Sequence, residues 1–383
     1  MPPTHFARPT WTLILRVFLI AIAIGYNFAL MGPIAEELGA HFGVGLGAVG
    51  VLTTLLLVTH ALSQLPAAEP AQRIGPLKLV RYAFVLVTAA NLLGAISPVF
   101  WLLGLSRLIA GCGTGPIFVG GLDGARRLGG PFLAGIFGGA ATFGLGLALL
   151  VGAMFDHYGM SWRLTFFVAA GLSLVAVLFG PKDGDAPRPV AGSVVEHLGV
   201  VLRSGPLWRL ALIHSTSFGA SLVIGAWIVT HLVNGQVSTF LAGAIGFGLL
   251  GIAAVFRPVG GALVARGVPW FYLGPVAIVV TAAGLGVLAL SPPTWIAASA
   301  SLLVGIGLAI PFSAIFAVAV KAEPNFPAAA IAFVNMAGAV FALALTPFVG
   351  LLMDNSIGGL AFALMAVLAL VSAVVARNPL RAS

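Results

Sequence analysis

The chain has 383 residues, of which 60% are apolar and only 7% are charged, and its mean hydropathy is +1.12. A soluble domain carries about 25% charged residues, so this composition excludes an ordinary water-soluble protein. The net charge is +8, but the basic residues are scattered over short segments without interleaved aromatic residues, so nucleic acid is not an expected partner.

Twelve apolar runs have about the 20 residues that a helix needs to cross a lipid bilayer. In chain order they lie near 11–32, 46–66, 79–98, 101–121, 132–153, 162–180, 208–232, 239–260, 271–290, 294–316, 328–352 and 357–376. The longest polar stretch, 181–206, separates the sixth run from the seventh and predicts a linker, within which 194–202 is expected to form a short amphipathic surface helix. We therefore predict an all-α polytopic membrane protein with a six-helix half over 1–180 and a second six-helix half over 207–383.

Three landmarks recur in the same order at nearly one interval. Arg73 is followed 193 positions later by Arg266, and the Gly-x-Gly that begins at Gly111 is followed 194 positions later by one that begins at Gly305. The segment that ends at Asp156 is echoed 198 positions later by the segment that ends at Asp354. Together they indicate a duplicated unit, as in the parallel repeats of secondary transporters.

Lys and Arg are distributed unevenly between alternate loops. The loops 235–239, 291–294 and 355–359 carry no basic residue, and Arg163 is the main exception on that side. The basic residues of the other loops are Arg73, Lys78, Arg81, Arg126, Arg127, Lys182, Arg188, Arg203, Arg266, Lys321, Arg377 and Arg381. This asymmetry predicts that both termini are cytoplasmic. We expect a multi-pass protein of the bacterial cytoplasmic (inner) membrane, with the lipid bilayer as its surroundings.

Loop and helix motifs resemble those of the major facilitator superfamily over the whole chain. After the second helix the family has a signature close to G-x-L-x-D-R-x-G-R-R; here Gln72 replaces its Asp, and Ala265 stands at the equivalent place in the second half. The segment from Arg107 to Gly113 matches the family's fourth-helix pattern R-x-x-x-G-x-G. The resemblance implies two six-helix halves that rock about a central site. It assigns a conformational loop motif to Arg73, Gly75, Lys78 and Arg266.

The segment from Arg257 to Gly261 is similar to the eighth-helix motif of nitrate/nitrite porters, in which the Arg binds the substrate anion. The second-helix R-x-P of that group is Gln64-Leu65-Pro66 here, so the other anion-binding Arg of that group is missing, which argues against nitrate itself. The chain also resembles cyanate-type permeases and porters of small organic anions. The resemblance implies a small anionic solute with Arg257 as its charge partner. The alternative is that Arg257 reaches the cytoplasmic interface as an anchor.

Polar side chains within a membrane span are costly, so each is a candidate for function. For Arg107 the alternative is a structural role, and for the histidines it is hydrogen-bonded packing. No Asp or Glu lies in the middle of a run, so a proton relay through a buried carboxylate is not expected, although a histidine could titrate in its place. The substrate-binding candidates are Arg257, Arg107, Tyr26, Asn27, Gln64, His60, His214 and Asn335.

The sequence lacks the groups that an enzyme or a metal site would need. No nucleophile–base pair or metal-ligand spacing appears, and the single Cys112 has no partner, so we expect no metal and no cofactor. We predict a secondary active or facilitative transporter of a small anionic solute, expected to be a monomer, with a coupling proton or a counter-anion as further partners. The alternative is an exporter of drugs or hydrophobic metabolites.

Overall fold

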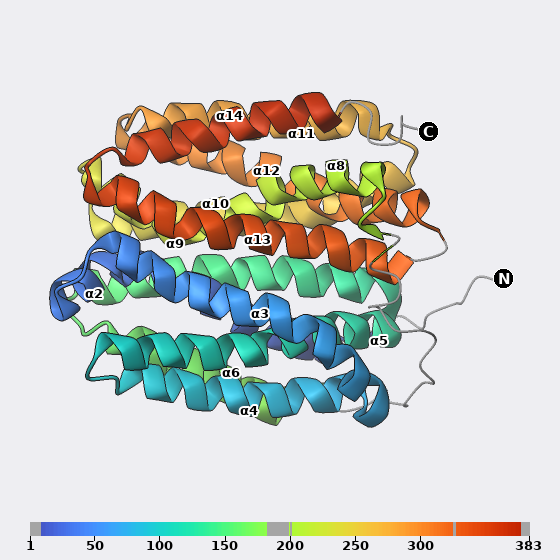
Figure 1. The fold of residues 1–383 in the computed structure, drawn as a ribbon, viewed down its shortest axis with the longest axis horizontal. Helices are drawn as coiled ribbons and strands as arrows, with labels where there is room; N and C mark the ends of the chain where they lie inside the picture. Colours follow the sequence, from blue (N-terminus) through green and yellow to red (C-terminus); the bar gives the residue numbers. More distant parts are fainter. Residues whose placement is uncertain (1–8, 182–198, 200, 325–326, 377–383) are drawn as a thin grey trace.

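The computed structural model describes residues 9–181, 199, 201–324 and 327–376, and these residues form a bundle of long helices without strands (Figure 1). The first half contains α1 (Trp11–Ala29), η1 (Gly32–Ile34), α2 (Ala35–Phe42), α3 (Leu46–Ile74), α4 (Pro76–Ala95), α5 (Phe100–His157) and α6 (Arg163–Phe179). The second half contains α8 (Gly205–His214), η2 (Ser215–Gly219), α9 (Ala220–Asn234), α10 (Thr239–Ala265), α11 (Trp270–Ala289), α12 (Thr294–Ala322), α13 (Pro327–Asp354) and α14 (Gly358–Ala376).

The membrane-spanning character of the helices is confirmed. Within the described ranges, 11 helical segments are long and apolar enough to cross a membrane, and Arg163–Phe179 is a shorter apolar helix. The seventh predicted run consists of α8, η2 and α9 in succession, and η2 is a π-helical turn. The surface helix expected over 194–202 lies mostly outside the described residues.

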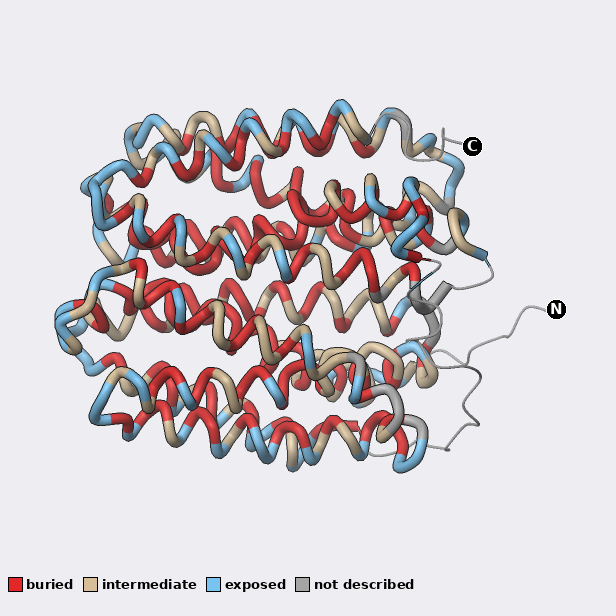
Figure 2. Tube along the Cα trace, in the orientation of Figure 1, coloured by how far each residue is buried: buried red, intermediate tan, exposed pale blue. Residues whose placement is uncertain are grey.

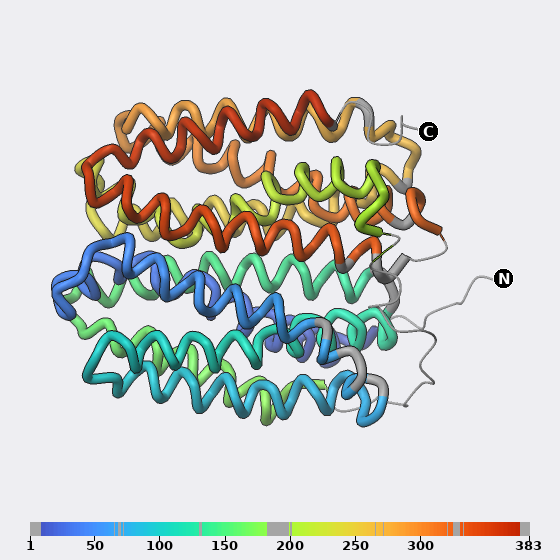
Figure 3. The backbone as a smooth tube through the Cα atoms, viewed as in Figure 1, coloured from blue at the N-terminus to red at the C-terminus, as the bar shows by residue number. Residues whose placement is uncertain are grey.

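The chain between the fourth and fifth predicted runs is helical rather than an extended loop, so both runs belong to one long helical element, α5. The helix nevertheless folds back on itself. The rings of Phe118 and Phe137 lie 6.0 Å apart, whereas 19 residues of straight helix would separate them by about 28 Å. The reversal occurs between the spans Phe100–Gly129 and Phe132–His157, where two glycines and a proline stand together (Figure 3).

The duplicated Gly-x-Gly patterns occupy matching positions in the two halves. A Cβ on Gly113 would lie 2.9 Å from the carbonyl oxygen of Ala83 on α4, and one on Gly307 would lie 2.6 Å from that of Ala277 on α11. The first span of α5 therefore packs on α4 as α12 packs on α11. Backbone contacts this close need small residues, as is usual where membrane helices cross.

Side chains on the outside of the bundle are largely apolar, as the hydrocarbon of a bilayer requires. Buried and exposed positions alternate along the helices (Figure 2). Phe179, Val276 and Val374 are 62%, 63% and 70% exposed, respectively. Residues that face the interior are buried along most of each helix.

The two halves meet closely at the end of the bundle that carries α2, which we call the α2 end. A Cβ on Gly47 would lie 2.7 Å from Leu351, and one on Gly243 would lie 2.8 Å from the Leu149 carbonyl oxygen. Trp227 is 1% exposed; its indole nitrogen donates to the Thr346 carbonyl oxygen at 2.8 Å, and its ring edge lies 3.0 Å from where a Cβ on Gly50 would stand. Toward the other end of the bundle, a Cβ on Gly135 would meet nothing within 4 Å.

Candidate functional site

Arg257 lies on α10 at the boundary between the halves and is only 6% exposed. Its guanidinium carbon stands 3.8 Å from the centre of the Phe312 ring and 5.9 Å from that of Phe218. Its Nη1 donates to the Gly138 carbonyl oxygen of the first half at 3.4 Å, near the limit for a hydrogen bond, and its Nε has no partner. Among the described residues, no carboxylate forms an ion pair with it. The guanidinium is thus a buried cation that packs against aromatic rings and whose Nε–H group is available to an acceptor.

The backbone around Arg257 is shaped by the proline that follows it. Because Pro258 has no N–H, the carbonyl group of Ala254 lacks its usual partner within the helix. That carbonyl oxygen faces Gly139 of the first half, where a Cβ would stand 2.9 Å away. The hydroxyl of Ser313 donates to the carbonyl oxygen of Arg257 itself, which ties α12 to α10.

His214 lies next to this group, directly before the π-helical turn. Its ring centre is 5.4 Å from those of Phe218 and Phe312 and 5.0 Å from that of Phe316. Arg257 and Asn335 are the polar residues that face it, although neither ring nitrogen meets hydrogen-bond geometry with a described group, and neither does the Asn335 Oδ1. Buried polar atoms without partners are rare in folded proteins, so their concentration here is typical of a place where a ligand supplies the missing bonds.

In the first half, His60 and Gln64 on α3 form a chain of hydrogen bonds with Thr114. The Thr114 hydroxyl donates to the Gly111 carbonyl oxygen at 3.2 Å, so its oxygen accepts from His60 Nδ1 at 3.1 Å. His60 Nε2 is then free to accept from the Gln64 amide at 2.8 Å. The neutral imidazole therefore orients Gln64, which is partly exposed.

Aromatic rings connect the His60 chain to Arg257. Phe28 and Phe118 lie against His60, with ring centres 4.9 and 6.0 Å away. Phe118 contacts Phe137, the residue before the glycine whose carbonyl oxygen accepts from Arg257.

The structure places Arg107 and Asn27 elsewhere, in a separate buried network of the first half. Arg107 Nη2 donates to Asn91 Oδ1 at 2.8 Å, Asn91 Nδ2 donates to Asn27 Oδ1 at 2.9 Å, and Asn27 Nδ2 donates to the Ala23 carbonyl oxygen at 2.8 Å. The guanidinium of Arg107 also lies 4.7 Å from the centre of the Phe166 ring. These contacts favour a structural role for Arg107, whose Nη1 nevertheless has no hydrogen-bond partner among the described groups. Tyr26 is fully buried, and its hydroxyl has no hydrogen-bond partner among the described groups.

Several contributors to these clusters were not identified from the sequence. Phe218, Phe312 and Thr114 lie in apolar runs, where no spacing distinguishes them from packing residues. Asn91 is a polar residue of the third run that was not among the candidates. The asparagine could have been found by the cost of burying an amide in a membrane. The phenylalanines carry no such signal.

The loop-motif residues lie at helix ends on the side opposite α2. Gly75 joins α3 to α4 with a φ of 95°, a conformation that favours glycine, and Arg73 and Lys78 are exposed. Arg266 is the C-terminal capping residue of α10. The side chains of Gln72 and Ala265 are outside the described set.

Two further expectations concern the charged and metal-binding groups. Asp123 pairs with Arg126 at 3.1 Å and with Arg127 at 2.5 Å. Its charge is therefore balanced by these two arginines and not by a group in the interior of the bundle. In the described part of the chain, no group of three or more His, Cys, Asp and Glu side chains is arranged to hold a metal ion.

Known proteins of similar sequence are membrane transporters. The chain is 24% identical over 192 residues to an uncharacterized MFS-type transporter, YbcL, of Bacillus subtilis, covering 47% of this chain and 48% of that protein. It is 24% identical over 248 residues to the 2-nitroimidazole transporter of Escherichia coli, covering 63% of this chain and 62% of that protein. The chain thus spans about half to three fifths of the lengths of these relatives.

Solved structures show the same fold at low sequence identity. A D-xylose-proton symporter superimposes with a TM-score of 0.80 at 15% identity, covering 97% of both chains. A single-residue mutant of the nucleoside transporter NupG gives 0.76 at 13%, covering 96% of this chain and 100% of that one. A bacterial homologue of the lysosomal transporter Spinster, in an inward-facing and unoccupied conformation, gives 0.75 at 14%, covering 96% of both chains.

The sequence model of the Major Facilitator Superfamily matches residues 17–341, which is most of the chain. The match agrees with the bundle of two six-helix halves and with the cluster of buried polar groups at their boundary. The chain belongs to the major facilitator superfamily and is a multi-pass membrane protein, and the named proteins to which it is similar are transporters and not enzymes.

Proposed function

We propose that the protein is a transporter that works by alternating access and carries a small anionic solute, with Arg257 as the charge partner of the anion. The main support for this proposal is the environment of Arg257. Its side chain is buried at the boundary of the halves and stacks on Phe312, and no described carboxylate forms an ion pair with it. Charge in a membrane interior is costly unless it is paired or serves the transport path. A guanidinium presents parallel donors that suit a carboxylate or a comparable oxyanion.

The other members of the proposed site complement the charge. His214, which faces Arg257, and Asn335, which faces His214, offer unpartnered polar atoms. His60 and Gln64 offer an oriented amide from the first half. Tyr26 contributes a buried hydroxyl. Arg107 and Asn27 support the site at a distance, through the packing of the first half.

The proposal includes the placement of the protein in the cell. The protein lies in a bacterial inner membrane as a monomer, with both termini in the cytoplasm and the α2 end toward the outside. Its domains are the halves 1–180 and 207–383, with a cytoplasmic linker over 181–206. The uneven distribution of Lys and Arg supports this orientation.

Coupling to a proton or to a counter-anion belongs to the same proposal. Asp156, Glu323 and Asp354 lie at helix ends, and Asp123 within α5 pairs with Arg126 and Arg127. An exchange of anions, or a proton that travels with the solute or through a histidine, therefore fits better than a carboxylate relay.

A second candidate is a neutral, planar or hydrophobic solute that is exported. The observation in its favour is the aromatic lining around Arg257 and His214, formed by Phe218, Phe312 and Phe316. The relative named as a 2-nitroimidazole transporter supports this candidate as well.

Thermal unfolding of the purified protein in detergent distinguishes the two candidates. Nitrate, nitrite, formate, acetate, benzoate and neutral 2-nitroimidazole would each be added to the wild type and to the Arg257→Gln variant. A ligand that binds only the folded state stabilises it by about 2.7 kcal/mol at 100 times its Kd. We expect at least one anion to raise the unfolding temperature of the wild type and to lose this effect in Arg257→Gln.

Arg163→Gln is the matched control, because Arg163 lies beside Trp162 at the α2 end, away from the site. It should respond to the anion as the wild type does. An anion that stabilises Arg257→Gln equally would show that Arg257 is not its partner. Stabilisation by 2-nitroimidazole alone would favour the second candidate.

A further inference from the structure

Helix α3 begins without a side chain that caps it. Its N-cap residue is Gly45, with φ −72° and ψ 162°, and no side chain of its own segment accepts from the first turn. The first N–H groups of a helix need acceptors from outside the helix, which Ser, Thr, Asp or Asn at the N-cap usually supplies. The acceptor for α3 must therefore come from another part of the molecule.

Asp354, the last residue of α13 in the other half, supplies it. Its Oδ1 accepts from the Leu46 N–H at 2.7 Å, and its Oδ2 accepts from the Gly47 N–H at 2.9 Å. A carboxylate also interacts favourably with the positive end of the helix dipole. One side chain thus caps a helix that starts 308 residues earlier in the chain.

Gly45 leaves the space that this contact needs. The three atoms nearest to a Cβ there, at 2.9 to 3.4 Å, all belong to the Asp354 carboxylate. A residue able to cap α3 from its own segment would therefore collide with the cap that comes from α13.

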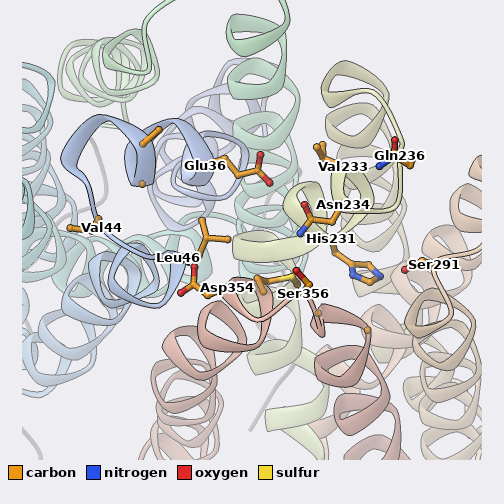
Figure 4. Close-up of a pocket in the computed structure, with 15 residues that line it drawn as sticks. Glu36, Val44, Leu46, His231, Val233, Asn234, Gln236, Ser291, Asp354 and Ser356 are labelled. Carbon is orange, nitrogen blue, oxygen red and sulfur yellow. Dashed lines mark hydrogen bonds between the residues drawn. The ribbon is translucent and has the colours of Figure 1, made fainter.

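The contact lies at the α2 end, on the wall of a cavity of about 620 Å³ lined by both halves. Figure 4 shows Asp354 beside Leu46, with Glu36 of the first half and His231 of the second around the same cavity. The neighbouring contact of Gly47 with Leu351 also joins α3 to α13. In alternating access the halves must separate at this end in one phase of the cycle, and both hydrogen bonds then break.

We propose that Asp354 is a latch that favours the state closed at the α2 end, by capping α3 across the boundary of the halves. The latch shifts the equilibrium between the two states because its two hydrogen bonds exist in only one of them. The proposal rests on alternating access alone and not on the identity of the solute.

The repeat provides an internal comparison. Asp156 ends the echoed segment of the first half and lies near Thr239, at the start of α10. It accepts no hydrogen bond from that helix start among the described residues, and the side chain of the N-cap residue Ser238 makes no capping hydrogen bond either. Asp156 and Asp354 therefore occupy similar places in the two halves, but of these two only Asp354 caps a helix of the opposite half in the described structure.

The test measures the distance between the halves at the α2 end by pulsed electron paramagnetic resonance in nanodiscs. In a Cys112→Ser background, spin labels would replace the exposed residues Met160 and Leu290, one on each half. An N-cap contributes about a five-fold factor to an equilibrium. We expect Asp354→Ala to raise the ratio of long to short distances about five-fold, and Asp156→Ala to change it less than two-fold.

A second variant separates a latch from a general stabilising role. In Gly45→Ser combined with Asp354→Ala, the serine fits because the colliding carboxylate is gone, and it caps α3 within its own half. This double variant should recover the thermal stability that Asp354→Ala loses, while the ratio of long to short distances stays raised. An unchanged ratio in Asp354→Ala, or a ratio that the serine returns to the wild-type value, would overturn the proposal.

Discussion

At the scale of single residues, the two buried arginines show how much depends on neighbouring helices. Arg107 and Arg257 are 1% and 6% exposed, and in the sequence both are isolated cations in apolar runs. Arg107 donates a hydrogen bond to Asn91 on α4, whereas Arg257 stacks on aromatic rings and donates a long hydrogen bond to a carbonyl oxygen of the first half. The motif around Arg257 could be recognised in the sequence, but the partners of both residues depend on contacts between helices that no local pattern encodes.

The network around Arg107 leads to a prediction about stability. Asn91→Ala removes the acceptor of Arg107 Nη2 and the donor to Asn27, so the buried guanidinium keeps only the long hydrogen bond from its Nε to the Ser106 hydroxyl among the described groups. We expect the free energy of unfolding to fall by about 1–3 kcal/mol. Denaturant unfolding in detergent measures this change.

The control for this variant is Asn355→Ala. Asn355 is exposed, and its side chain donates to the Leu351 carbonyl oxygen one turn earlier, so its loss should change stability by less than about 0.5 kcal/mol. If Asn91→Ala is as stable as the wild type, water already accepts the hydrogen bonds that Arg107 donates.

At the scale of elements, the sequence predicted the spans better than the connections between them. Hydropathy identified each crossing helix, because a span must be apolar over its whole length. It did not predict that α5 stays helical through Arg126 and Arg127, since charged residues at the bilayer surface suit a helix as well as a loop. It also gave no sign of the π-helical turn at Ser215–Gly219, which arises where hydroxyls such as that of Ser217 bond to the backbone of α12.

The matched Gly-x-Gly patterns give a prediction at this scale. Gly113→Ala and Gly307→Ala would each push a methyl group into a neighbouring helix, at α4 and α11, respectively. We expect each to lower the free energy of unfolding by about 1–3 kcal/mol, because the backbones cannot approach as closely. Thermal unfolding in the same detergent measures both.

Gly286→Ala on α11 is the control, since a Cβ there meets nothing within 4 Å. It should show no loss of stability. If Gly113→Ala and Gly307→Ala are as stable as this control, the two crossings have more room than the contacts indicate.

At the scale of the whole molecule, the two ends of the bundle are held differently. The family's loop signature normally has an Asp where this chain has Gln72, and Ala265 stands at the equivalent place in the second half. At the α2 end, by contrast, Asp354 joins the halves. The resemblance revealed the substitutions in the sequence, but the contact of Asp354 required the structure, because its partners are backbone groups and any helix start offers those.

The orientation of the molecule in the membrane leads to a further prediction. The basic loops lie on the side opposite α2, so the C-terminus is expected in the cytoplasm. A green fluorescent protein fused at the C-terminus should fluoresce, and alkaline phosphatase at the same place should be inactive. Phosphatase inserted after Gln236, between α9 and α10, should be active. The reverse pattern would place the α2 end in the cytoplasm.

The position of Trp227 has an optical consequence. The indole belongs to the second half through its bond to Thr346, yet its edge rests against Gly50 of the first half at the α2 end. The ring is 1% exposed while that end is closed, and we expect its edge to meet water when the halves part there. Its fluorescence emission then moves to longer wavelength, so the unlabelled protein carries a spectroscopic signal of which side is open.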